Sequence, residues 1–251
     1  MAPARNARTP NAHTESKPDG PRLPSAPRSI ETGSTLKTLL GPEAIDCLGE
    51  NIARVHRPFP ATRFAREARA GLEPLGIMDR GKHLARTLRN HLPDNYATAV
   101  GILVDSLGPP HSRTDDLGLA PFFYLPHVQF VALFGADPEG NGGQDPFEPS
   151  MRAQYEITRR FSAEFSIRTF LLRWPERTLT RLLEWTADAD PHVRRLCSEG
   201  SRPRLPWAAR LPHFIQDPKP VLPILERLRD DDELYVRRSV ANHLGDIAKD
   251  H

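Results

Sequence analysis

The sequence predicts an all-α protein built from antiparallel helical pairs, and two observations support this fold class. Apolar residues recur at helical spacing from Leu36 nearly to the end of the chain, with Pro and Gly at the joins between segments. The tripeptide Val-Arg-Arg at Val193 returns 43 positions later at Val236, inside the ~40–47-residue period of HEAT and armadillo helical pairs. We therefore expect a curved solenoid of HEAT-like repeats.

Length and composition suit one such domain. Of the 251 residues, 38% are hydrophobic, which is enough for a substantial core. The 34 basic and 32 acidic residues give a net charge of only +2, so any surface for anions must come from local clustering of arginine. Cys47 and Cys197 lie far apart and no histidines have ligand spacing, so the sequence indicates neither a disulfide framework nor a zinc site.

The first 34 residues differ from the rest of the chain. They are rich in Pro, Ser, Thr, Asn and Arg and poor in large apolar residues, so they cannot bury enough surface to offset the entropy of ordering. We expect a disordered tail over 1–34 and the repeat domain over 35–251. No apolar run reaches the ~20 residues of a membrane span, and the N-terminus has no apolar signal core, which predicts a cytoplasmic protein without membrane contact.

The first half of the domain reads as short helices joined by Pro- and Gly-marked turns. The helical patterns cover 36–55, 64–75, 79–93 and 95–108. After a loop over 108–120, the segment 120–135 carries five aromatic residues, which we expect in the core, with a base-stacking platform as the alternative.

The longest uninterrupted helical pattern runs from Ser150 to Trp174. It places Phe161, Phe165, Arg168 and Leu172 on one side, and Glu164 lies four positions before Arg168. Two interpretations remain open for this pair. It is an ordinary surface ion pair worth ~0.3–0.5 kcal/mol, or the carboxylate lies in an apolar, arginine-braced environment of the kind that holds catalytic acids.

Residues 190–207 carry the most unusual sequence in the chain. Asp190 is a favoured helix cap and Pro191 suits a first helical turn, so a helix should begin here and end near Gly200. Pro203 and Pro206 then oppose further helix. We expect the residues that follow, Arg202, Arg204 and Trp207, to leave the helix along a stiff, exposed path.

The repeated Val-Arg-Arg motif predicts a buried valine followed by arginines along the concave edge. A regular row of guanidinium groups would match the regular phosphates of a nucleic acid. The first arginine of each pair, at 194 and 237, has an equally weighted structural interpretation, an Asp–Arg ladder that stacks neighbouring repeats.

Three segments resemble a known family, the HEAT-like-repeat DNA alkylation repair glycosylases of the AlkC and AlkD type, and the AlkC branch in particular. They are Phe-Ser-Ala-Glu-Phe-Ser-Ile-Arg-Thr-Phe-Leu at 161–171, His-Val-Arg-Arg-Leu-Cys-Ser-Glu-Gly-Ser-Arg-Pro-Arg-Leu-Pro-Trp at 192–207, and Val-Arg-Arg-Ser-Val-Ala-Asn-His-Leu-Gly-Asp-Ile-Ala-Lys-Asp at 236–250. The resemblance implies a cradle around duplex DNA that hydrolyses the N-glycosidic bond of cationic N-alkylated bases such as 3-methyladenine, without fully inserting the base in a pocket. It implies no metal and no cofactor.

The resemblance also implies roles for individual residues. Glu164 is the first choice for the catalytic carboxylate, and Glu199 is the second, unless it braces the arginine-rich turn. Trp207 is the candidate aromatic contact, and Asn242, which occupies in its repeat the place of Glu199, is a candidate donor to the DNA backbone. The candidate phosphate contacts are Arg168, Arg194, Arg195, Arg202, Arg204, Arg237, Arg238 and Lys249.

The chain departs from the family pattern at two points. We expect a further acidic residue near Gln129, and we expect further repeats or a small β-domain after the position of His251. A monomer is expected for a solenoid that encloses a duplex. Two alternatives to the glycosylase remain, a HEAT-like module that binds DNA without cleaving it and a protein scaffold with no affinity for DNA.

Overall fold

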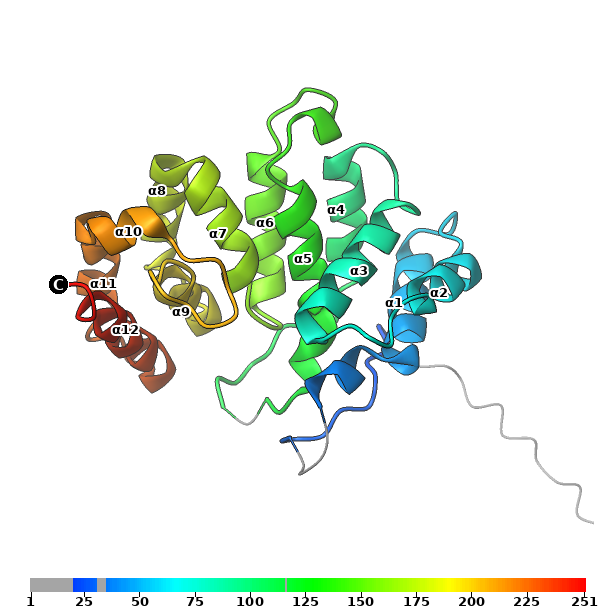
Figure 1. The fold of residues 1–251 in the computed structure, drawn as a ribbon, viewed down its shortest axis with the longest axis horizontal. Coiled ribbons are helices and arrows are strands. Elements are labelled where there is room, and N and C mark those ends of the chain that lie inside the picture. The colour runs from blue at the N-terminus through cyan, green and yellow to red at the C-terminus, as the bar shows by residue number, and fades with distance from the viewer. Residues whose placement is uncertain (1–19, 31–34, 116) are drawn as a thin grey trace, which may run out of the picture.

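The computed structural model describes residues 20–30, 35–115 and 117–251, and over these residues it contains helices and no strand, as the sequence predicts (Figure 1). The α-helices are α1 (Pro42–Val55), α2 (Ala61–Arg69), α3 (Ile77–Arg89), α4 (Tyr96–Asp105), α5 (Leu125–Phe134), α6 (Phe147–Thr158), α7 (Glu164–Arg173), α8 (Pro175–Trp185), α9 (Pro191–Gly200), α10 (Pro212–Gln216), α11 (Leu222–Leu228) and α12 (Leu234–Ile247). Four short 3-10 helices are η1 (Leu36–Leu40), η2 (Ala120–Tyr124), η3 (Glu139–Asn141) and η4 (Lys219–Val221).

The helices follow one another in chain order across the molecule, from α1 and α2 at one end to α12 at the other (Figure 1). One layer forms where α3 packs on α5, α5 on α7, α7 on α9 and α9 on α12. In the second layer α4 packs on α6, and α8 contacts α11. Stacking of neighbouring helical pairs confirms the predicted solenoid.

The hydrophobic core runs the length of this stack. Four of the five aromatic residues at 120–135 pack as the sequence predicts: Phe123, Tyr124 and Phe130 are buried, and Phe134 packs against Phe130. Phe122, the fifth, is partly exposed. Of these five aromatic residues, Phe122 is the one that lines the cavity described below.

The C-terminal repeat has the predicted form. Val193 and Val236 are both fully buried, and each lies in the first turn of the second helix of a pair, α9 after α8 and α12 after α11. Asp190 caps α9 by accepting a hydrogen bond from the backbone N–H of His192 at 2.9 Å. The capping residue and the repeat period thus set where these helices begin.

The pattern from Ser150 to Trp174 is not one helix, and this prediction is wrong. The chain leaves the helix after Thr158 and starts α7 at Glu164. The Thr158 hydroxyl accepts a hydrogen bond from the N–H of Ala163 at 3.1 Å, which replaces the helical ladder at the break. As a result Glu164 lies in the first turn of α7, where the helix dipole favours a negative charge.

Part of the expected tail is tied to the fold. Residues 20–30 run beside α1, where Arg22 and the Asn51 side chain exchange two hydrogen bonds of 2.7 Å. The prediction of disorder is therefore wrong for this stretch, because a buried amide pairs with its backbone. The remainder of the predicted tail, 1–19 and 31–34, lies outside the described residues. Within the described ranges no helix is long and apolar enough to cross a membrane.

Candidate active site

A cavity of about 390 Å³ lies where α7, α9 and α12 meet the segments 117–122 and 201–207. Its wall combines two carboxylates, two guanidinium groups and several aromatic rings. The lining residues are Leu117, Gly118, Pro121, Phe122, Phe161, Ser162, Glu164, Phe165, Arg195, Glu199, Arg202, Leu205, Pro206, Trp207 and Tyr235. Five of the residues singled out from the sequence, Glu164, Glu199, Arg195, Arg202 and Trp207, therefore meet in one place.

Glu164 has one carboxylate oxygen held and the other open. Its Oε2 accepts hydrogen bonds from the Ser162 hydroxyl at 2.8 Å and from Nη1 of Arg195 at 3.0 Å. No hydrogen bond from the described residues reaches Oε1 of Glu164. The side chain is only 15% exposed, so a largely buried and oriented carboxylate keeps one oxygen without a hydrogen-bond partner among the described residues.

Glu199 is held at both oxygens. Its Oε1 accepts from Nη1 of Arg202 at 2.7 Å, and its Oε2 accepts from the Ser239 hydroxyl at 2.7 Å. A nitrogen of Arg195 lies 3.6 Å from the same Oε1. The geometry therefore favours the bracing role for Glu199 that the sequence left open, and it supplies fixed negative charge beside Glu164.

The two arginines of the pocket are anchored by these acids. Burial acts to lower the pKa of Arg195, but Glu164, Tyr235 and Glu199 outweigh it, so the pKa is raised and the guanidinium stays charged. Arg202 bonds Glu199 and, through Nε, Asp246 at 2.9 Å. Because both guanidinium groups are paired inside the protein, neither Arg195 nor Arg202 is the open phosphate contact that the sequence predicted.

Trp207 is presented on a braced segment. It is 63% exposed, and its φ of 62° is the one left-handed value of a non-glycine residue in the described ranges. The segment 200–209, which carries Trp207, is fixed by Arg168. This arginine donates to the carbonyls of Gly200, Arg202 and Ala209 at 3.1, 2.6 and 2.7 Å. The fixed segment leaves the indole available to a ligand.

The prediction that Arg168 contacts DNA is wrong. It is 2% exposed, and burial lowers its pKa to about 10. Its guanidinium is satisfied by the backbone carbonyls of a segment some 40 residues away in the chain. The predicted ion pair between Glu164 and Arg168 is also absent from the contacts of the described residues, since Glu164 pairs with Arg195 instead.

The first arginines of the two Val-Arg-Arg motifs have different structural roles. Arg194 pairs with Asp231 of the next repeat through two hydrogen bonds of 2.6 and 2.9 Å, which is the Asp–Arg contact between repeats that the sequence allowed. Arg237 instead donates to the backbone carbonyls of Asp231 and Asp232 in the turn before its own helix. Both guanidinium groups are therefore engaged within the protein, which favours the structural interpretation over the predicted phosphate contact for Arg194 and Arg237.

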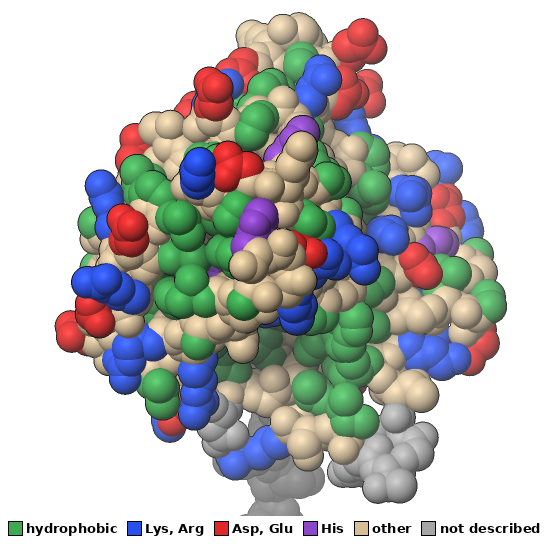
Figure 2. Space-filling view, turned by 60° about the vertical axis from the view of Figure 1, so that its left-hand side comes forward, with side chains coloured by type: hydrophobic (Ala, Val, Ile, Leu, Met, Phe, Trp, Pro, Cys, Tyr) green, Lys and Arg blue, Asp and Glu red, His purple; other side chains and the backbone are tan. Residues whose placement is uncertain are grey.

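The other predicted phosphate contacts differ in their exposure and in whether an acidic side chain pairs with them. Arg204 pairs with Asp250, and Lys249 pairs with Asp246 at 3.1 Å although it stays 63% exposed. Arg238 and Asn242 are exposed on α12. Figure 2, which turns the C-terminal end forward, shows basic and acidic side chains interspersed there, as expected when most arginines have acidic neighbours.

The sequence missed several pocket residues. Tyr235 immediately precedes the second Val-Arg-Arg, as His192 precedes the first, and this matched position was the available signal. Phe122 belongs to the aromatic segment 120–135, for which a base-stacking platform was the alternative, whereas no sequence feature pointed to Ser162. Gln129, where a further acid was expected, is buried on α5 and does not line the cavity. No group of three or more His, Cys, Asp or Glu side chains in the described ranges is arranged to hold a metal ion.

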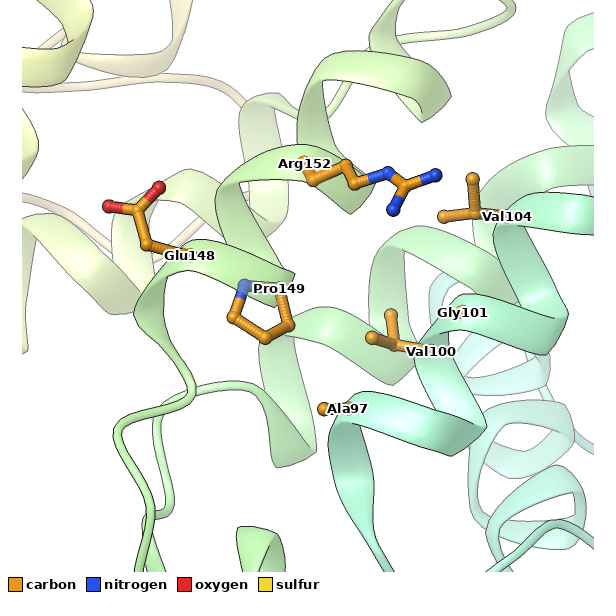
Figure 3. A pocket seen from close by; sticks show the side chains of 7 residues that line it. All are labelled: Ala97, Val100, Gly101, Val104, Glu148, Pro149 and Arg152. Atoms are coloured by element: carbon orange, nitrogen blue, oxygen red, sulfur yellow. The ribbon is translucent and has the colours of Figure 1, made fainter.

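A second cavity, of about 490 Å³, lies between α4 and α6 (Figure 3). Its wall is mostly apolar, with Val100 and Val104 on α4 facing Pro149 on α6. The Glu148 carboxylate points away from this wall and bonds Arg181 on α8 at 2.8 Å. This cavity brings no two acids together and lacks the features of a reactive site.

The fold and the first cavity together define a helical-repeat protein with an acid–arginine pocket beside an exposed tryptophan. No family model matches the sequence. The chain is 38% identical to the alkylpurine DNA glycosylase AlkC of Pseudomonas fluorescens, solved bound to DNA containing an abasic site analog, with a TM-score of 0.75 over 87% of this chain and 56% of that one. It is 37% identical over 217 residues to the uncharacterized protein YhaZ of Bacillus subtilis (strain 168), covering 86% of this chain and 56% of YhaZ.

These comparisons confirm the resemblance to the AlkC branch of the HEAT-like-repeat glycosylases, in sequence and in fold. The chain spans little more than half the length of both proteins.

Proposed function

We propose that this chain is a DNA glycosylase of base excision repair, which hydrolyses the N-glycosidic bond of cationic N-alkylated bases such as 3-methyladenine in duplex DNA. The observation that carries the proposal is the half-held carboxylate of Glu164, with one oxygen fixed by Arg195 and Ser162 and the other open to the cavity. The fold match to AlkC bound to abasic-site DNA supports the same activity.

Hydrolysis of the N-glycosidic bond of a cationic base requires few catalytic groups besides the Glu164 carboxylate. A positively charged base is already a good leaving group, so the bond to C1′ of the sugar weakens without a proton from the enzyme. The open Oε1 of Glu164 stabilises the oxocarbenium-like charge on the sugar and accepts a proton from the attacking water. Glu199 adds a fixed negative charge nearby, while Arg195 keeps Glu164 oriented.

The aromatic residues supply the rest of the site. Trp207 lies exposed at the cavity, where an indole face attracts a cationic base or packs on a sugar. Phe122, Phe161 and Phe165 line the same cavity and exclude water, which strengthens electrostatic stabilisation. Arg238 and Asn242 on α12, and Lys249 in the turn that follows it, are the exposed polar groups that would contact the DNA backbone.

Removal of the Glu164 charge tests the proposal. The 251-residue chain is incubated with methylated duplex DNA and released 3-methyladenine is measured, in parallel with binding to an abasic-site duplex. Glu164→Gln should lower release by at least about 100-fold, because the charge that stabilises the transition state is lost. Binding and the unfolding midpoint should stay close to those of the unaltered chain.

Glu148→Gln is the matched control, since Glu148 is also an arginine-paired glutamate beside a cavity, and it should leave release unchanged. Full release by Glu164→Gln would remove Glu164 from the mechanism. Binding of DNA without release by the unaltered chain would favour a non-catalytic DNA-binding module. Absence of binding even at low salt would favour a protein scaffold.

A further inference from the structure

Tyr235 lies in the first turn of α12 and belongs to the cavity wall, but it takes no part in the chemistry described above. Its ring is in contact with two groups. The guanidinium carbon of Arg195 lies 5.0 Å from the ring centroid, and the His192 ring meets it edge-on with centroids 5.5 Å apart. Tyr235 is therefore fixed on one side and offers its ring to Arg195.

Arg195 needs such a support. Its side chain must reach from α9 to α7 to bond Oε2 of Glu164 at 3.0 Å, and the long aliphatic stem of an arginine has several rotamers. Acidic groups hold the guanidinium at its edges, with Glu164 on one nitrogen and Glu199 3.6 Å from another. The ring of Tyr235 adds electron-rich contact to the cation, which fixes where the guanidinium lies.

We propose that Tyr235 is a positioning residue for the glycosylase reaction, which holds Arg195 so that the open oxygen of Glu164 is aimed at the sugar. The inference rests on the proposed function. It assigns the effect to the ring, because the guanidinium carbon of Arg195 lies 5.0 Å from the ring centroid. Burial raises the pKa of the Tyr235 hydroxyl, but the hydroxyl is also near enough to Arg195 for the cation to act to lower that pKa, so the ring and the hydroxyl must be separated by experiment. If Arg195 were more mobile, the Glu164 carboxylate could rotate away from its orientation toward the sugar. Small displacements of a catalytic group lower the rate constant strongly.

The repeat architecture accounts for how this contact arises. Tyr235 and His192 occupy the position before Val-Arg-Arg in successive repeats, and α9 packs directly on α12. Stacking of the repeats therefore brings the two rings together and places Tyr235 beside the second arginine of the preceding repeat. The same register that pairs Arg194 with Asp231 of the next repeat builds this support.

Single-turnover release of 3-methyladenine separates the ring from the hydroxyl. Tyr235→Leu should lower the rate constant about tenfold, in the range of a lost cation–π contact at a desolvated site, while binding to an abasic-site duplex changes less than about twofold, because Tyr235 acts on Glu164 and not on DNA. Tyr235→Phe keeps the ring and should keep the rate within about twofold.

A matched control comes from a second arginine–tyrosine contact. Tyr155 on α6 has Arg159 5.6 Å from its ring centroid and does not line the cavity. Tyr155→Leu removes a similar contact and should leave the rate constant unchanged. A purely structural role for Tyr235 predicts instead that both leucine variants lower stability and rate together.

Arg195→Lys tests whether the effect passes through Arg195. Lysine keeps the charge and lacks the planar face, so adding Tyr235→Leu to Arg195→Lys should cost clearly less than the tenfold loss in the unaltered background. A full tenfold loss in both backgrounds would overturn the inference, as would a wild-type rate in Tyr235→Leu or an equal loss in Tyr235→Phe. Absence of release by the unaltered chain would overturn the proposed function and this inference with it.

Discussion

The two cavities of this molecule differ in where their charges lie. The cavity between α4 and α6 is larger, about 490 Å³ against about 390 Å³, but its glutamate turns outward to Arg181 and is 61% exposed (Figure 3). The cavity at α7, α9 and α12 holds two glutamates of 15% and 6% exposure, each held by an arginine. The smaller cavity is therefore our candidate for the reactive site, because buried and oriented charge is typical of such sites.

The two cavities differ in charge because different types of side chain line them. The wall between α4 and α6 is built from Ala97, Val100, Gly101 and Val104, which pack without polar partners. The polar network at α12 needs Arg202, Glu199 and Asp246 together, because each buried charge is stable only when it is paired. The region of the proposed site thus contains buried charges that depend on one another for pairing.

The largest difference should appear when one arginine is removed from each region. Arg202→Met removes the buried guanidinium that joins Glu199 and Asp246, which leaves Glu199 with Ser239 and Asp246 with the exposed Lys249. It should lower the free energy of unfolding by about 3 kcal/mol. Arg181→Met breaks pairs with exposed glutamates and should cost about 1 kcal/mol or less. Urea unfolding of both variants checks this, and equal losses would contradict the comparison.

A smaller effect should appear on acidification, and here both regions should respond. Burial lowers the pKa of His127 on α5 to about 3 and that of His243 on α12 to about 4. Between pH 6.5 and pH 5 the unfolded chain takes up protons at these histidines while the folded chain does not, so stability falls as the pH falls. The expected loss is about 1.5 kcal/mol per histidine over this interval.

Urea unfolding at pH 6.5 and pH 5 measures that loss. His127→Phe should remove roughly half of it, since the ring packs among Phe123 and Tyr124 and needs no proton. A pH dependence that is unchanged in His127→Phe would show that His127 is protonated in the folded state. At more acid pH the α12 region should lose further stability. Although burial opposes ionisation of Asp246, Arg202 and Lys249 outweigh it and lower the pKa of this carboxyl.

The sequence predicted those features that depend on local pattern and period. The cap at Asp190, the buried valines and the 43-residue repeat all follow from residues close in the chain or one period apart. The two carboxylates were also found, because they lie in segments whose residue pattern is distinctive. Glu164 and Glu199 then meet through the packing of α7 on α9, which the repeat itself implies.

The features that were missed depend on contacts between distant segments. Arg168 is buried because the segment 200–209 covers it and accepts its hydrogen bonds at backbone carbonyls. The residues of its own helix give no sign of this contact. The sequence did not predict the break before α7, because Phe161 and Phe165 fit a continuous helical period. The Thr158 hydroxyl accepts the backbone hydrogen bond at the break, but threonine is common on helix surfaces and does not by itself predict the end of a helix. The place of Tyr235 beside His192 and Arg195 depends on the packing of α9 on α12, which the sequence does not give in atomic detail.

The smallest effect on stability, and one confined to the reactive region, is expected at Arg238. Its side chain is exposed on α12 and no ion pair with another described residue holds it, so Arg238→Ala should change the free energy of unfolding by less than about 0.5 kcal/mol. If it contacts a phosphate, the slope of log affinity against log salt for duplex DNA should fall by about 1. Arg229→Ala is the control, because Arg229 is also exposed but bonded to its neighbour Asp230. An identical salt slope in Arg238→Ala and the unaltered chain would place the DNA track away from α12, and would leave the exposed Trp207 as the contact that joins the acid–arginine pocket to the duplex.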